Sequence, residues 1–343
     1  MESLGTSLNV SPIGFRTREA ITTHFWPPAD LPMFQQKILN WEPYFGYYER
    51  QCRAALVDRG RFVMAKTHHD ILKIIRSFDN GSSREVIRES LRLNLTAPGR
   101  SNENEILDGA IDLAARLYLM VNIAADTRTI SEQTRVEWTT GELKDCVRAH
   151  FQEPQILSDA GFRLEPIFTA ANLECVTGIR VVPTDNLADH LRLMDRDGTV
   201  AVFCNASFLW RHVSDVFPDG LLAETLQTLS LLFPANEKQT QNWLRKNSKS
   251  EGIDQALSSC ELLRLEERQL ERFKFWHDRL VILKQAFDHS RPATISQWWY
   301  DRRNGVQWYT FWVAIVVLFL TIFFGLVQSI EGALQVYKAF HPS

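Results

Sequence analysis

The most apolar stretch of the chain runs without interruption from Trp308 to Val327 and contains no charged residue. In the sequence, 17 of its 20 residues are apolar. As a helix rising about 1.5 Å per residue, the run spans roughly 30 Å, the thickness of a bilayer's hydrocarbon core. A buried core helix fits less well, because one face of a helix in a soluble protein normally meets water. The pattern predicts one transmembrane helix over 308–327.

Upstream of this run, apolar residues mostly recur at helical spacing. We expect helices over His68–Phe78, Ile106–Ile123 and Leu221–Phe233. Ser82 and Glu85, three residues apart, form a capping box that predicts the start of a further helix. The periodicity indicates a body built mainly of helices.

The middle of the chain carries the clearest strand signal. Residues 178–183 and 199–204 are short β-branched runs that predict two strands. Between them, Thr184 or Asp185 is placed to cap a short helix, and Asp195–Gly198 reads as a turn. The predicted fold class is therefore mainly α (α+β), with a small strand-helix-strand patch in a helix-rich body.

These patterns divide the chain into consecutive parts. The aromatic stretch from Trp41 to Tyr48 predicts a packed start to the body, with an interaction surface as the alternative. The stripe of Leu257 to Phe287 predicts one long amphipathic helix that packs on the body, with pairing to a second chain as the alternative. The predicted parts are an irregular N-terminal segment (1–35), a cytosolic α+β body (36–250), a long connecting helix (253–290), the transmembrane helix (308–327) and a short C-terminal tail (328–343).

Composition narrows the class of protein only slightly. The chain has 343 residues, of which 45% are hydrophobic and 23% charged, as in ordinary globular proteins. Its formal net charge of −3 offers no positive field for nucleic acid, so we expect no nucleic-acid partner. The mean hydropathy of −0.19 resembles that of a soluble protein and conceals the apolar run.

Residues flanking the apolar run predict a membrane interface and an orientation. Amphipathic rings favour the headgroup region, and basic residues favour the cytosolic side. The excess of arginine before the run places the body in the cytosol, and the 16 residues after Val327 indicate a tail anchor. The full-length span and neutral tail favour the endoplasmic reticulum, with the tail lumenal. The predicted interface residues are Trp298, Trp299, Arg302, Arg303, Trp308 and Trp312.

Cysteines and glycosylation motifs bear on the same question. The five cysteines are odd in number and scattered, which suits a reducing compartment. Three sequons begin at Asn80, Asn94 and Asn205 and argue weakly for a lumenal body. Such triplets also arise by chance, and the sequence leaves open whether they are used.

Small residues lie along one face of the apolar helix. Gly325, Ser329 and Ala333 are four residues apart, a spacing that lets helices approach closely in lipid. The pattern predicts weak homo-oligomerisation, with chance spacing as the alternative. The other expected partners are the lipid bilayer and proteins on the cytosolic face.

Candidate chemistry is sparse. Asp185 and Asp189, four residues apart on a helix, could join His190 in holding a divalent metal. A simpler interpretation makes Asp185 a helix cap and leaves Asp189 and His190 solvated. Zinc, phosphate-loop, dinucleotide and nucleophile-elbow motifs are absent from the sequence, so no cofactor is predicted and no catalytic residue is assigned.

Three stretches resemble a group of filamentous-fungal (ascomycete) tail-anchored membrane proteins. They are FTAANLECVTGIRVVPTDNLADHLRL (168–193), FPDGLLAETLQTLSLLFP (217–234) and QWYTFWVAIVVLFLTIFFGLVQSIEGALQVYKA (307–339). The resemblance implies a fungal source and a membrane anchor, and it transfers no catalytic residue. Such proteins resemble accessory members of gene clusters for secondary metabolism.

The sequence is therefore consistent with two functions. The first is a non-enzymatic, single-pass protein that presents a cytosolic interaction domain on an intracellular membrane. The alternative is a membrane-tethered accessory enzyme, or an accessory protein, of a secondary-metabolite gene cluster. A deep pocket with perturbed carboxylates would favour an enzyme, and a flat apolar groove would favour a binding module.

Overall fold

The computed structural model describes most of the chain. The described residues are 2–26, 33–57, 63–94, 102–125, 133–152, 155–157, 163–194, 198–247, 253–260, 262–290 and 305–340. They fall into two units, one of residues 1–174 and 178–289 and one of residues 175–177 and 290–343. The first unit, called the body below, holds the hydrophobic core.

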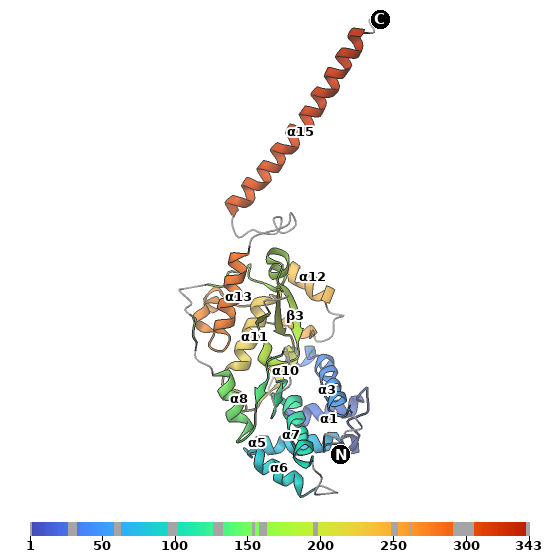
Figure 1. Ribbon diagram of the computed structural model, residues 1–343, viewed down its shortest axis with the longest axis vertical. Helices are drawn as coiled ribbons and strands as arrows, with labels where there is room; N and C mark the ends of the chain where they lie inside the picture. The colour runs from blue at the N-terminus through green and yellow to red at the C-terminus, as the bar shows by residue number, and fades with distance from the viewer. Residues whose placement is uncertain are drawn as a thin grey trace. The chain divides into compact units, whose positions relative to one another are not determined.

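Helix α7 (Glu103–Leu119) is the centre of the N-terminal half of the body. Its apolar residues are buried nearly all round, as a helix enclosed by others requires. Four elements pack on it, and two of them, α5 and α6, lie together with α7 at one end of the body in Figure 1. The elements around α7 are α3 (Glu42–Ala55), α5 (His68–Asp79), α6 (Arg84–Arg92) and β1 (Ile123–Ala124).

The predicted strands form the core of the C-terminal half. β3 (Arg180–Thr184) pairs in parallel with β5 (Thr199–Phe203), which confirms both strands. β5 also pairs antiparallel with β4 (Arg192–Met194), giving the order β3-β5-β4. β4 was not predicted, because three half-buried residues show no alternation.

Helices surround this sheet. α11 (Leu221–Leu232) confirms the helix predicted there, and α12 (Lys238–Asn247) and α13 (His277–His289) lie on either side of β3 in Figure 1. The remaining elements are η1 (Glu2–Gly5), α1 (Phe15–Phe25), α2 (Met33–Ile38), β2 (Val136–Glu137), α8 (Leu143–Phe151), α9 (Ala170–Asn172), η2 (Leu173–Thr177), η3 (Leu187–Asp189), α10 (Ala206–Arg211) and the turns η4, η5 and η6.

Mainly α architecture with small sheets is confirmed, but two predicted segments are wrong. Residues 253–290 do not form one helix: short 3₁₀ turns at Gln255–Ser259, Leu265–Arg268 and Leu270–Arg272 precede α13. One cause is Glu224 of α11, whose buried carboxylate accepts the backbone N–H groups of Lys274, Phe275 and Trp276 at 2.8 Å each. These three hydrogen bonds keep the chain out of helical geometry just before α13.

The N-terminal segment is also more ordered than its prolines predicted. α1 occupies Phe15–Phe25, and Ile21, Phe25 and Trp26 are almost completely buried. The Trp26 ring stacks on Trp41 with a centroid distance of 5.3 Å. The aromatic stretch after Trp41 lies in α3 with Tyr44, Phe45, Tyr47 and Tyr48 buried, which confirms the packed start of the body.

Helix starts agree with prediction to within a few residues. The helix expected at 68–78 is α5, which begins with a capping box between Thr67 and Asp70. The next helix, α6, has Ser83 rather than Ser82 before its first turn, and Ser83 makes no capping hydrogen bond. Residues 195–197 of the predicted turn lie outside the described residues.

Candidate functional site

Helix α15 (Gly305–Phe340) is a candidate membrane anchor. Over the described part of the chain, it alone is long and apolar enough to cross a membrane, with a mean hydropathy of 2.6 over the most apolar 18 residues of its Trp308–Tyr337 stretch. None of that apolar window is buried inside the protein. Its 36 residues correspond to about 54 Å, longer than a bilayer core. The helix predicted over 308–327 is therefore confirmed and continues past both ends of that range.

Two of the predicted interface residues can be placed. Trp308 and Trp312 lie one turn apart near the start of α15, both partly exposed, with ring centroids 6.1 Å apart. This puts amphipathic rings at one end of the apolar helix, as an aromatic belt requires. Trp298, Trp299, Arg302 and Arg303 lie outside the described residues.

The small residues of the predicted helix contact share one exposed face of α15. Gly325, Ser329 and Ala333 are all exposed, and a Cβ atom added at Gly325 would meet nothing within 4 Å. The face is therefore free to approach another helix. Homo-oligomerisation through it stays a prediction.

The three candidate metal ligands serve separate partners. Asp185 pairs with Arg50 at 2.6 Å, and Asp189 accepts from Asn186 and Arg192. Asp189 and His190 are buried rather than solvated, and Asn186 caps the short turn in place of Thr184 or Asp185. In the described residues, no group of three or more His, Cys, Asp or Glu side chains is arranged to hold a metal ion.

His190 instead links strand β5 to helix α11. Its Nδ1 accepts the N–H of Phe203 at 3.1 Å, and its Nε2 lies 2.7 Å from the Thr228 hydroxyl. Complete burial lowers the pKa of His190 well below its usual value, so the ring is neutral at physiological pH. These contacts describe a structural residue of the core.

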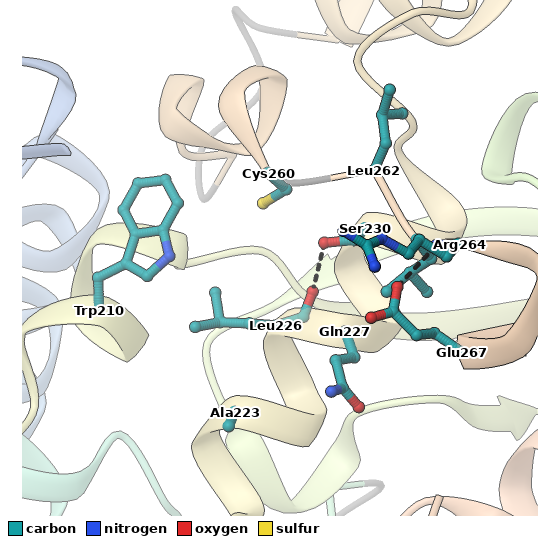
Figure 2. Close-up of a pocket in the computed structure, with 10 residues that line it drawn as sticks. Trp210, Ala223, Leu226, Gln227, Ser230, Cys260, Leu262, Arg264 and Glu267 are labelled. Carbon is teal, nitrogen blue, oxygen red and sulfur yellow. Dashed lines mark hydrogen bonds between the residues drawn. The ribbon is translucent and has the colours of Figure 1, made fainter. Parts of the chain in front are cut away.

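Two hollows lie along the exposed side of α11 and meet at Ala223. The first has a volume of about 480 Å³. Figure 2 shows Trp210 on one side, Arg264 and Glu267 on the other, and α11 side chains between them. Its lining residues are Trp210, Ala223, Leu226, Gln227, Ser230, Cys260, Leu262, Leu263, Arg264 and Glu267.

The polar groups of this first hollow are largely used in local hydrogen bonds. The Ser230 hydroxyl donates to the carbonyl of Leu226, and the Glu267 carboxylate accepts the backbone N–H of Arg264 (Figure 2). Trp210, Leu226 and Leu263 leave part of their apolar surface uncovered. The hollow is suited to an apolar side chain framed by a charged rim.

The second hollow, of about 460 Å³, lies at the start of α11. It is lined by residues 212–215, 217–220, 222 and 223, which include His212 and Ser214. Neither hollow was predicted. The first is assembled from segments distant in sequence, and the second comes from the single stretch 212–223, whose shape depends on how the chain turns into α11. The signal available was local: Ala223 and Gln227 lie one turn apart on the exposed face of α11.

No protein-family model, curated protein or solved structure matches this chain.

Proposed function

We propose that this protein is a single-pass, tail-anchored membrane protein that presents its helix-rich body to the cytosol, with the endoplasmic reticulum as the favoured membrane. The observation that carries the proposal is α15, whose apolar stretch is entirely exposed within the protein and needs another apolar environment.

Thiols and sequons support the cytosolic orientation. None of the five cysteines forms a disulfide, and Cys52, Cys204 and Cys260 are buried where they cannot form external disulfides. Asn205 is only 2% exposed, so a glycan there is incompatible with the folded body. Asn80 and Asn94 are exposed, which makes them natural reporters of a lumenal location.

A fractionation experiment tests the anchor and its orientation. The full chain is expected to float with membranes and resist alkaline extraction, whereas a chain ending at residue 292 is expected to stay soluble. In sealed membranes, protease is expected to digest an N-terminal tag. A mobility shift reversed by endoglycosidase, and lost when Asn80 and Asn94 are replaced by Gln, would place the body in the lumen and overturn the orientation.

The body is proposed to bind a protein segment that inserts an apolar side chain into the first hollow. The volume of about 480 Å³ and the half-covered Trp210, Leu226 and Leu263 support this occupant. Ala223→Arg would fill the hollow from its exposed edge, and Phe15→Arg, at a residue 79% exposed, is a matched control. Proximity labelling from the N-terminus is expected to lose partners in the first variant only. Unchanged labelling would exclude this hollow.

A second candidate function, a membrane-tethered enzyme, is favoured by one specific observation. The second hollow contains a serine hydroxyl hydrogen-bonded to a buried histidine, Ser214 and His212.

A further inference from the structure

Ser214 and His212 form a closely spaced pair at the second hollow. The Ser214 Oγ lies 2.7 Å from the His212 Nε2, within the range required for proton transfer. Ser214 is half-buried and lines the hollow, so its hydroxyl is both positioned and accessible. In the tautomer that carries its proton on Nδ1, Nε2 accepts from the Ser214 hydroxyl, and this is the contact by which a histidine activates a serine nucleophile.

His212 is fixed by an aromatic enclosure. Its ring lies between 5.0 and 5.8 Å, centroid to centroid, from Trp26, Tyr118, Phe208 and Phe217. Burial lowers the pKa of His212 to about 3, which keeps the imidazole unprotonated at neutral pH. The Nδ1 atom has no hydrogen-bond partner among the described residues. The side chain therefore directs its bonded nitrogen, Nε2, toward the hollow's serine.

The start of α11 supplies the complementary feature. Gly220, with a φ of 91°, turns the chain sharply into the 12-residue helix. The N–H groups of Leu222 and Ala223 bond to no backbone carbonyl in the described part of the chain, and both residues line the same hollow. Unpaired N–H groups and the positive end of the helix dipole stabilise a developing oxyanion.

We propose that this hollow is an ester-reactive site in which Ser214 is the nucleophile, His212 the general base and the N-terminus of α11 the oxyanion-stabilising group. The serine, the histidine and the helix N-terminus all line one cavity, although the sequence between 212 and 223 matches no hydrolase motif.

The hydrolysis of an ester at this site requires no cofactor. Ser214 Oγ attacks the ester carbonyl carbon while its proton moves to His212 Nε2. The oxyanion collapses, the ester C–O bond breaks, and the leaving alcohol takes the proton from His212. Water then repeats the sequence on the acyl-serine, releasing a carboxylic acid and restoring the Ser214 hydroxyl.

The lining indicates the class of ester. Val213, Phe217 and Leu222 provide apolar surface, and the Asp219 carboxylate lies at the exposed edge. The second carboxylate, Asp215, pairs with Lys144 and is partly neutralised. Among the described residues no cation pairs with Asp219, whose carboxylate repels anionic substrates, so the site is suited to a neutral ester with a short apolar group.

Covalent labelling tests the nucleophile directly. The full chain in detergent is treated with a fluorophosphonate probe, and peptide mass spectrometry locates the added mass. We expect modification at Ser214, at least tenfold above its level in heat-denatured protein. Ser214→Ala should lose that modification, whereas Ser77→Ala, at another half-buried serine, should label like the wild type. Folding of each variant is checked by its thermal unfolding midpoint.

Turnover tests the substrate class. Hydrolysis of p-nitrophenyl butyrate should fall at least tenfold in Ser214→Ala, and a carboxylate-bearing analogue should react several-fold more slowly than the neutral ester. Asp219→Asn should narrow that difference. Absence of probe on Ser214 in the folded wild type, or equal labelling and hydrolysis in the Ser214→Ala variant, would overturn the proposal.

Discussion

At the scale of single residues, buried charge gives the clearest physical test of the structure. The Arg84 side chain is fully buried, and its guanidinium reaches Asp112 at 2.7 Å and Asp108 at 3.0 Å. It also lies over the Trp138 ring, 4.8 Å from the centroid. The cluster joins α6 to α7, and removal of the arginine would leave the carboxylate of Asp112 buried without its cation.

Replacement of Arg84 by Met is expected to lower the free energy of unfolding by about 3–5 kcal/mol, because an uncompensated buried carboxylate remains. Arg88→Met is the matched control, since Arg88 also pairs with Asp108 but is partly exposed, and it should cost less than about 1 kcal/mol. Urea unfolding followed by tryptophan fluorescence measures both. Equal losses of unfolding free energy in the two variants would show that burial of the arginine does not determine how much this cluster stabilises the body.

At the scale of elements, strong local periodicity predicted helices and strands correctly. Structure that depends on contacts between residues distant in sequence was not predicted. The helices at 68–78 and 221–233 and the strands at 180–184 and 199–203 follow directly from local patterns. The break of 253–290 depends on Glu224, whose partners lie 50 or more residues away. The Ser214–His212 pair was missed because its significance depends on the aromatic enclosure and on the start of α11, which no local motif encodes.

Helix α1 lies in the N-terminal segment that the sequence pattern predicted to be irregular. Ile21 is completely buried, whereas Thr23, two residues later, is exposed. Ile21→Ala is expected to lower the free energy of unfolding by about 2–5 kcal/mol through lost burial and the resulting cavity. Thr23→Ala should change it by less than about 0.5 kcal/mol. Chemical denaturation would contradict the packing of α1 if Ile21→Ala were as neutral as the control.

The length of α15 raises the question of which part lies in lipid. Leu318 and Leu320 are both exposed on the helix. If 308–327 spans the membrane, the double substitution Leu318→Arg and Leu320→Arg should make the free energy of membrane insertion about 5–7 kcal/mol less favourable. The same change at Leu334 and Tyr337, beyond that range, should cost little. The fraction that resists alkaline extraction measures insertion in both variants. A comparable loss in the second pair would shift the span toward the C-terminal end of α15.

At the scale of the whole molecule, the body contains several histidines that must remain neutral. Burial lowers the pKa of His68 to about 4 and that of His212 to about 3, and it lowers the pKa of His190 well below its usual value. A depressed folded-state pKa means that the stabilising contribution is complete above the unfolded-state pKa of about 6.5 and is lost as the pH falls below it.

Buried carboxylates act in the opposite direction, since burial also raises the pKa values of Asp79, Asp112 and Glu224. Burial raises the pKa of Asp254 to about 6, so its contribution is complete at low pH and is lost as the pH rises through 6. Between pH 6.5 and 5, His68 and His212 each remove about 2 kcal/mol and His190 acts in the same direction, while Asp254 returns about 1.4 kcal/mol. We expect the histidines to outweigh the carboxylates, so acidification destabilises the body.

We therefore expect the free energy of unfolding to fall by a few kcal/mol between pH 7 and pH 5, a large share of the stability of an ordinary domain. Thermal unfolding of the full chain in detergent at both pH values measures the change. His68→Gln, which replaces a ring bonded to the Tyr48 hydroxyl, should reduce the pH dependence by about 2 kcal/mol, because one fewer buried group takes up a proton on unfolding. His24→Gln, at an exposed position, should leave it unchanged. A midpoint that rises on acidification would mean that the histidines are protonated within the folded body, against the aromatic enclosure that keeps His212 neutral.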